Sequence, residues 1–189
     1  MRFIAITSPK VINEDVYLIK SLFERGIDII HLRKPDSCAN ECRKLLEKLT
    51  KEERARIIIH NYPELYYEFE LKGIHINRHI STPPWDYDGF KTRSCHSFEE
   101  ISKYKNEYDY LFLSPIFDSI SKKGYKSEFN EMDLKLAKKE GIIDEKVIAL
   151  GGITFDKISH LKSLNFGGIA LSGAIYNIEA IKQLKYLGK

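Results

Sequence analysis

The chain is poor in sulfur-containing residues and tryptophan: among 189 residues there are three cysteines, two methionines and one tryptophan. An odd number of cysteines without a paired C-x-x-C spacing excludes a closed disulfide framework and argues against a structural zinc site. We therefore expect Cys38, Cys42 and Cys95 to be buried or half-buried free thiols.

Long apolar runs are also missing. The first residues, MRFIAITSPK, hold only a short apolar stretch. Such a stretch is too brief for the core of a signal peptide or for a membrane span. Together with the free thiols, this predicts a cytoplasmic protein that does not bind membranes.

Neither sign of charge dominates the sequence. Thirty Lys and Arg residues stand against 27 Asp and Glu residues, which leaves a formal net charge of +3. Because the charges are mixed along the chain, we expect no nucleic-acid partner. With 43% hydrophobic residues, residues 1–189 are predicted to form one globular domain with a sizeable core.

Eight short β-branched and aliphatic runs recur along the chain, and most are continuously apolar. They are FIAIT from Phe3, IDIIHL from Ile27, RIIIH from Arg56, GIHI from Gly73, TRSCH from Thr92, YLFLSP from Tyr110, VIALGG from Val147 and GIALSG from Gly168. A continuous apolar run is typical of a parallel strand that is covered on both faces. These runs therefore predict eight parallel strands.

Amphipathic segments lie between the apolar runs. Helices are predicted over 14–26, 98–106, 132–141, 155–167 and 177–188, with Gly26 as a C-terminal cap and Ser97 and Asn177 as N-terminal caps. Strands that alternate with helices predict a (β/α)₈ TIM barrel, and a doubly wound open sheet is the alternative. Since the chain is short for a barrel, the connection over 77–90, which contains Pro83, Pro84 and Gly89, is expected to lack a long helix.

In a barrel, the carboxyl ends of the strands share one rim, where such folds bind ligands. Gly151 and Gly152 end the seventh run, and Ser172 and Gly173 end the eighth. Glycines at such places let backbone N–H groups approach an anion, which predicts a phosphate cup. The alternative is that Gly151 and Gly152 serve only a tight turn.

Two further features add donors to the same rim. The loop after the sixth run carries Ser119, Ser121 and Lys122, which could grip a second phosphoryl group. Arg33 follows the second run and suits bidentate contact with phosphate. The loop residues are equally compatible with ordinary solvated surface.

Neutral and titratable polar side chains are also found at or near the ends of the predicted strands. His31, His60, His75 and His96 lie in or at the ends of the second to fifth runs, and they lack the spacing of a metal site. Histidines that line the barrel are the simplest interpretation, and His31 or His60 is a candidate for acid–base work on a ligand. Neutral hydrogen-bonding groups such as Asn61, Ser94 and Ser114 could orient a heteroaromatic substrate.

Five fragments of the sequence, IIHLRKP, TRSCHS, LFLSPIFDSISKKG, VIALGGI and GGIALSGAIY, resemble strand-end motifs of the thiamin phosphate synthase and TenI family. The resemblance implies that hydroxymethylpyrimidine diphosphate loses pyrophosphate and that the nitrogen of thiazole phosphate captures the resulting cation. It assigns pyrophosphate binding to Arg33, Ser119, Ser121 and Lys122. It also matches Ser94 to a serine of the family, and Gly152 with Ser172 to the thiazole-phosphate cup.

The sequence departs from the family at four positions. Pro35 stands where the synthases have a phosphate-contacting lysine, for which Lys34 is a candidate substitute, and His31 stands where they have a glutamine. The magnesium aspartate after the third run corresponds to Asn61, and a second one, after the fourth run, has no acidic counterpart. Mg²⁺ is therefore implied by the resemblance without its carboxylate ligands, and no metal-binding residue is assigned.

The resemblance leaves several functions open. Synthase-type condensation is the first expectation. A TenI-like aminothiazole tautomerase is the second, although Pro115 stands where the histidine of that enzyme is expected. The third is an inactive binder of phosphorylated ligands, and another phosphosugar barrel is the fourth. Family members of this size tend to self-associate, so a homodimer is also expected.

Overall fold

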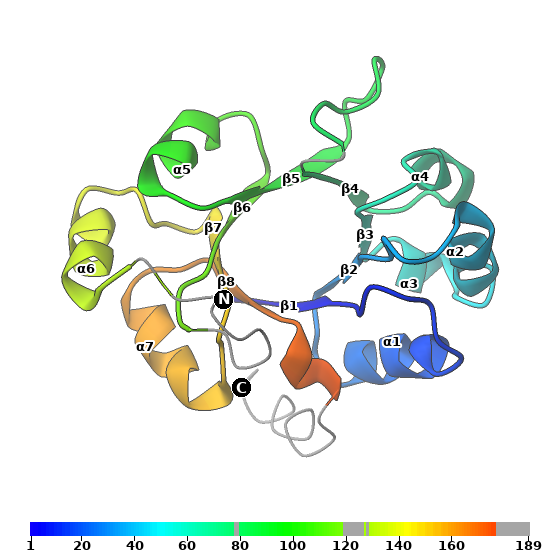
Figure 1. The fold of residues 1–189 in the computed structure, drawn as a ribbon, viewed down its shortest axis with the longest axis horizontal. Coiled ribbons are helices and arrows are strands. Elements are labelled where there is room, and N and C mark those ends of the chain that lie inside the picture. Colours follow the sequence, from blue (N-terminus) through cyan, green and yellow to red (C-terminus); the bar gives the residue numbers. More distant parts are fainter. Residues whose placement is uncertain (78–79, 119–126, 128, 177–189) are drawn as a thin grey trace.

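Eight parallel strands close into one barrel in chain order, and β8 pairs with β1 (Figure 1). The computed structural model describes residues 1–77, 80–118, 127 and 129–176. The helices lie outside the ring of strands (Figure 1). The predicted (β/α)₈ barrel is confirmed, and the closed strand order excludes the doubly wound open sheet.

The strands coincide with the eight apolar runs of the sequence. They are β1 (Arg2–Ile6), β2 (Ile29–Leu32), β3 (Ile57–Ile59), β4 (Gly73–Ile76), β5 (Phe90–Cys95), β6 (Tyr110–Leu113), β7 (Val147–Leu150) and β8 (Gly168–Leu171). Every residue of β2, β3, β4, β6 and β8 is buried. The continuous apolar runs thus reflect strands that are covered on both faces.

Four of the predicted helices, those over 14–26, 98–106, 132–141 and 155–167, are present, and three helices that were not predicted follow β2 and β3. The helices are α1 (Asp15–Glu24), α2 (Ala39–Leu46), α3 (Lys51–Arg54), α4 (Glu64–Phe69), α5 (Phe98–Tyr104), α6 (Glu131–Lys139) and α7 (Ile158–Ser163), with the 3₁₀ helices η1 (Phe155–Lys157) and η2 (Gly173–Tyr176). Ser97 caps α5 as predicted, because its side chain accepts a hydrogen bond from the amide of Glu100. Gly26, just past α1, adopts the left-handed φ of 94° that suits a C-terminal cap. The helix expected over 177–188 lies outside the described residues.

The connection between β4 and β5 contains no helix in its described residues, as Pro83, Pro84 and Gly89 predict. It projects beyond the ring of helices (Figure 1). Across the part of the chain that the structure describes, no helix is long and apolar enough to cross a bilayer.

Two apolar cores hold the barrel together. The larger packs between the strands and the helices. The smaller fills the barrel interior and consists of Ile4, Ile6, Ile29, Ile58, Tyr110, Phe112, Ile148 and Ala170. Since side chains of a strand alternate between its two faces, these interior residues fix which positions of each strand point inward.

The cysteines are free, as predicted, but not all are buried. Burial raises the pKa of the Cys42 thiol to about 11 and that of Cys95 to about 12. These two thiols are therefore poor nucleophiles at neutral pH. Cys38 is exposed, contrary to the expectation, because it stands at the N-terminal cap of α2.

Candidate functional site

The carboxyl ends of all eight strands meet at one mouth of the barrel. The register pairs Leu32 with Ile59 and Leu150 with Ala170, so the residues that follow these pairs lie side by side on the rim. Counting in steps of two from the interior residues places Arg33, Gly152 and Ser172 on the inward side of their strands. The predicted anion-binding residues of β2, β7 and β8 are thus brought to the same end of the barrel.

Gly151 and Gly152, at the end of β7, both have left-handed backbone conformations, with φ of 96° and 61°. A Cβ at Gly151 would lie 2.8 Å from Pro115, and one at Gly152 would lie 2.7 Å from the carbonyl oxygen of Phe117. The glycines therefore allow the segment after β6 to pack against the end of β7. This close packing supports the tight-turn interpretation, and it leaves the amides available for a ligand.

The backbone donors at the ends of β7 and β8 have no acceptor among the described residues. Within the described part of the chain, the amides of Gly151, Gly152, Ser172 and Gly173 donate to no acceptor. The carbonyl oxygen of Gly152, in contrast, accepts a hydrogen bond from Lys157 Nζ at 2.9 Å. Free N–H groups beside an ammonium group suit a phosphate, because each of them attracts negative charge.

Arg33 and Lys34 follow β2, and their side chains point in opposite directions. The backbone amide of Arg33 donates to Thr7 Oγ1 at 3.0 Å, and its guanidinium has no hydrogen bond to a described residue. Lys34 turns away from the mouth: its Nζ lies 2.7 Å from Asp15 Oδ2 and donates to the carbonyl oxygen of Lys10 at 2.9 Å. The expectation that Lys34 replaces the missing phosphate-contacting lysine is wrong, because this side chain is only 1% exposed.

The predicted pyrophosphate residues of the loop after β6, Ser119, Ser121 and Lys122, lie outside the described residues. Their assignment stays a prediction. Ser127 lies beyond them and binds back to the start of the loop, since its amide donates to Asp118 Oδ1 at 2.8 Å and its hydroxyl to the carbonyl oxygen of Ile116 at 2.8 Å.

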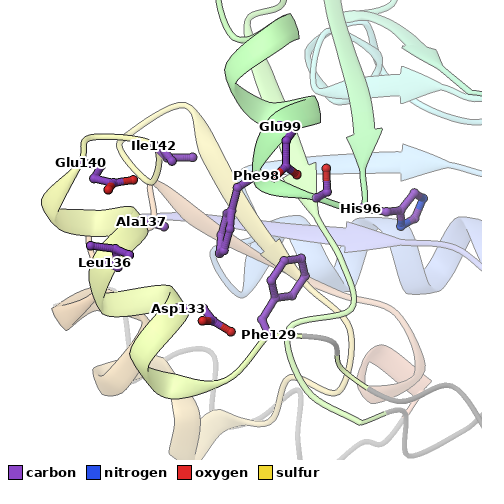
Figure 2. A pocket seen from close by; sticks show the side chains of 10 residues that line it. His96, Phe98, Glu99, Phe129, Asp133, Leu136, Ala137, Glu140 and Ile142 are labelled. Carbon is purple, nitrogen blue, oxygen red and sulfur yellow. The ribbon is translucent and has the colours of Figure 1, made fainter.

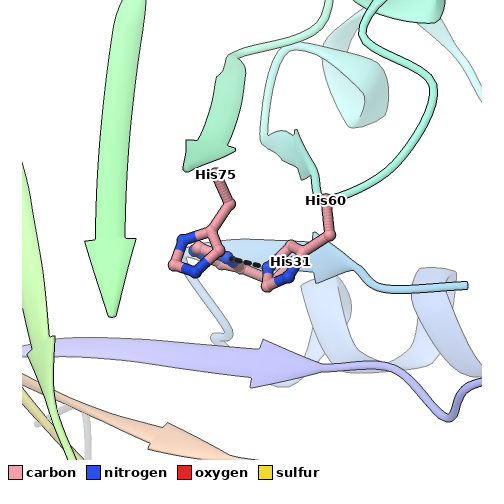
Figure 3. A group of neighbouring side chains, drawn as sticks. All are labelled: His31, His60 and His75. Atoms are coloured by element: carbon pink, nitrogen blue, oxygen red, sulfur yellow. Dashed lines mark hydrogen bonds between the residues drawn. The ribbon is translucent and has the colours of Figure 1, made fainter. Parts of the chain in front are cut away.

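Three histidines fill the barrel interior directly below the mouth (Figure 3). His31 Nδ1 lies 2.7 Å from His60 Nε2, and His31 Nε2 contacts the phenol oxygen of Tyr110. His60 stacks on His75, with ring centroids 4.1 Å apart. These histidines line the barrel, as the simplest interpretation predicted, and they form one connected cluster.

All three imidazoles are neutral. Burial lowers the pKa of His75 to about 3. Burial also holds the pKa values of His31 and His60 well below the usual range, and the positive charge of a protonated His75 would lower both further. Arg33 contributes to the lowered pKa of His60 and of His75. That contribution indicates that the guanidinium charge is close to the cluster, which fits its inward position.

Ser94 lies within β5 and not after the strand, and its side chain contacts the histidine cluster. Its hydroxyl is 3.0 Å from His75 Nε2, and the hydroxyl of Thr92 is 2.8 Å from His75 Nδ1. Ser94 is half-buried, so its place at the inner edge of the mouth is compatible with the predicted contact to a ligand. His96, just past β5, binds the carbonyl oxygen of Ser114 through Nδ1 at 2.8 Å.

The residues that correspond to the magnesium ligands of the family do not fit that ion. Asn61 offers one neutral oxygen, Oδ1, which is buried and has no hydrogen-bond partner in the described part of the chain. Asn77, after β4, uses its side chain to bind the carbonyl oxygen of His60 and the amide of Ile80. Because Mg²⁺ binds through carboxylates or substrate phosphates, a single amide oxygen does not support it.

The histidine cluster is also unsuited to a shared metal ion. Its ring nitrogens lie within 4.8 Å of one another. However, the planes of His60 and His75 are only 18° apart, so the lone pairs of the two stacked rings run side by side and do not meet at one point. A tetrahedral centre needs converging lone pairs, and these are absent from the arrangement.

Two residues of the site were not found by sequence reasoning. Lys157 reaches back from η1 to the end of β7, and its Nζ also lies 4.1 Å from the centre of the Phe117 ring. Tyr110 looks like the first apolar residue of a strand, but its phenol reaches the histidines. The alternation of β6 could have indicated this, since Tyr110 and Phe112 point inward together.

A separate hollow of about 290 Å³ lies on the outer face between α5 and α6 (Figure 2). Phe98, Phe129 and Leu136 line it, and His96 points away from it (Figure 2). It brings together none of the predicted site residues other than His96, so the mouth of the barrel remains the candidate site.

The fold is a (β/α)₈ barrel whose mouth brings together backbone amides, a lysine and an arginine. Residues 3–175 match the family model described as thiamine monophosphate synthase. The chain belongs to this family, which confirms the resemblance seen in the sequence.

Individual relatives agree with the family match. The thiamine-phosphate synthase of Bacteroides thetaiotaomicron is 27% identical over 82% of this chain and 80% of its own length, and that of Bacillus mycoides is 27% identical over 86% and 78%. A crystal structure of thiamine phosphate pyrophosphorylase from Bacteroides thetaiotaomicron superposes with a TM-score of 0.88 at 36% identity over the whole of both chains. The relatives are transferases, as the sequence predicted for this chain.

Proposed function

We propose that the protein is a transferase of thiamine-phosphate synthase type, which joins hydroxymethylpyrimidine diphosphate to thiazole phosphate and releases pyrophosphate. Family membership gives the class of reaction. The observation that carries the proposal is a set of donors at the mouth that have no acceptor among the described residues: the amides of Gly151, Gly152, Ser172 and Gly173, and the guanidinium of Arg33 at the end of β2.

The donors form two groups, as two phosphorylated substrates require. The amides at the ends of β7 and β8, with Lys157 beside them, anchor the phosphate of the thiazole. Arg33, at the end of β2, faces the diphosphate of the pyrimidine together with Ser119, Ser121 and Lys122, whose roles come from the family resemblance alone.

The reaction needs charge stabilisation and positioning more than proton transfer. The bond between the pyrimidine methylene carbon and the diphosphate oxygen breaks, and its electron pair leaves with pyrophosphate. The lone pair of the thiazole nitrogen then forms the new carbon–nitrogen bond. Arg33 stabilises the charge that develops on the leaving group, and the amides hold the acceptor within reach of the cation.

Neutral groups at the ends of β3 and β5 orient the pyrimidine. The buried oxygen Asn61 Oδ1 has no partner among the described residues, so an N–H group of the ligand would satisfy it. His60 and Ser94 lie at the same inner edge, and His31 acts from below through its contact with His60. No step depends on a protein-bound Mg²⁺.

Incubation of the purified protein with both substrates tests the proposal. Formation of thiamin phosphate, measured with added Mg²⁺ and with a chelator, is the expected result. No product under either condition would exclude the synthase function. Tight binding of thiazole phosphate without turnover would then indicate an inactive binder, and conversion of an aminothiazole phosphate would indicate a tautomerase.

A further inference from the structure

A chain of hydrogen bonds runs through the barrel interior from the bottom of β6 to the top of β3. Tyr110, the first residue of β6, contacts His31 Nε2, and His31 Nδ1 lies 2.7 Å from His60 Nε2. Figure 3 shows the link between the two imidazoles. Each imidazole is neutral and carries one proton, so the direction of the chain decides which nitrogen of His60 is protonated.

The phenol of Tyr110 sets this direction. Tyr110 is fully buried, and burial raises its pKa well above the usual value, so the phenol keeps its proton. Among the described residues, His31 Nε2 is the hydrogen-bond partner that the phenol has. If Nε2 carried a proton and donated it, the buried O–H of Tyr110 would have no acceptor. The phenol therefore donates, and His31 Nε2 accepts.

The protons of both imidazoles follow from that first bond. His31 accepts at Nε2, so its proton lies on Nδ1 and is donated to His60 Nε2. His60 accepts at Nε2, so its proton lies on Nδ1. That nitrogen has no partner among the described residues, although both ring nitrogens of His31 and of His75 do.

His75 keeps the ring of His60 in place without fixing its tautomer. The two rings are stacked, with planes 18° apart. His75 itself is bonded to the hydroxyls of Thr92 and Ser94, which can donate or accept. The direction of the chain is thus determined by Tyr110, whose protonated phenol has one hydrogen-bond partner among the described residues.

We propose that Tyr110 and His31 are positioning residues that hold the proton of His60 on Nδ1, so that a neutral N–H donor meets a hydrogen-bond acceptor of the substrate at the end of β3. The proposal deepens the proposed function and rests on it for the identity of the substrate. His60 directly precedes Asn61, the position at which the synthases have an anionic metal ligand, and a neutral donor adds no charge next to Arg33.

Histidine ¹⁵N spectroscopy of the labelled wild-type protein tests the tautomers directly, because protonated and bare ring nitrogens give well-separated signals. Single His→Gln variants assign the signals. We expect His31 and His60 both to be protonated on Nδ1. In Tyr110→Phe the donor to His31 is lost, and we expect the proton of His60 to move to Nε2 in at least part of the molecules.

Tyr108→Phe is the matched control. Tyr108 is also buried, and its phenol contacts Arg93 rather than the histidines. We expect its removal to leave the signals of His60 unchanged. A wild-type His60 protonated on Nε2 would overturn the proposal, and so would a Tyr110→Phe protein with the wild-type pattern. The wild-type spectrum decides the question even if Tyr110→Phe does not fold.

Titration with two probes tests the contact to the substrate. Inorganic pyrophosphate offers phosphoryl oxygens, and hydroxymethylpyrimidine offers ring nitrogens. We expect one of them to shift the Nδ1 signal of His60 in the wild-type protein. If neither does, the donor role is wrong. The spectra do not depend on turnover, so a failed synthase assay and a failed tautomer assignment remain distinguishable.

Discussion

Lowering the pH from about 7.5 to about 5 should destabilise the protein strongly, because His31, His60 and His75 are buried as neutral imidazoles. Their pKa values in the folded protein lie below the ordinary histidine value of about 6.5. In the unfolded chain each of them binds a proton below about pH 6.5, whereas the folded protein does not. The stability they contribute is therefore present above this pH and is lost as the pH falls.

The size of the effect follows from proton linkage. The pKa of His75 falls from 6.5 to about 3, which corresponds to roughly 5 kcal/mol over its full titration. Between about pH 7.5 and 5, the contribution of His75 to the unfolding free energy falls by about 2 kcal/mol, and the contributions of His31 and His60 fall in the same direction. Domains of this kind are stable by about 5–15 kcal/mol, so the loss should be prominent.

Urea unfolding at a series of pH values measures this dependence. Circular dichroism is the suitable signal, since Trp85 is fully exposed and its fluorescence reports poorly on the core. His75→Gln should reduce the slope of stability against pH, because one linked proton is removed. His96→Gln, at the exposed rim, is the control. A stability that stays constant between about pH 7.5 and 5.5 would refute the reasoning.

Three further predictions concern the mouth and its support. Lys34→Met leaves Asp15 buried without its partner and should lower the unfolding free energy, measured by urea titration, by about 3–5 kcal/mol. The double variant Asp15→Asn with Lys34→Met should recover part of this loss. Equal stability of the single and double variants would contradict this prediction. Gly152→Ala places a Cβ against the carbonyl oxygens of Phe117 and Asp118 at a φ of 61°. It should lower the unfolding free energy by at least about 1 kcal/mol and weaken the binding of thiazole phosphate measured by calorimetry. Unchanged binding would argue against the phosphate cup. Arg33→Gln should weaken pyrophosphate binding about 10- to 100-fold with little change in melting temperature, and unaltered affinity would exclude the proposed contact.

The barrel could be predicted because its strands carry their signal locally. A continuously apolar run such as VIALGG indicates a strand that is buried on both faces, and β7, which is formed by this run, is buried in the barrel wall. The shared location of Gly152 and Ser172 could be predicted as well, since chain order and a closed sheet put the ends of β7 and β8 side by side.

The contacts that give the site its chemistry could not be predicted in the same way. The link between His31 and Tyr110 joins residues 79 positions apart, and it depends on how deep each side chain sits in the barrel. The partner of Lys34, Asp15, lies on α1, and nothing in the sequence identifies it. The outward direction of Lys34 was within reach, because residues 29 and 31 of β2 point inward and position 34 has the opposite parity.

The layer of imidazoles inside the barrel constrains how the protein can change during evolution. An aliphatic residue at any one of the three positions would leave polar atoms of the neighbouring side chains without a hydrogen-bond partner in a space closed to water. Combined exchanges should therefore be tolerated better than single ones, with effects that are far from additive. Descendants of this chain are expected to keep His31, His60 and His75 or to lose them jointly.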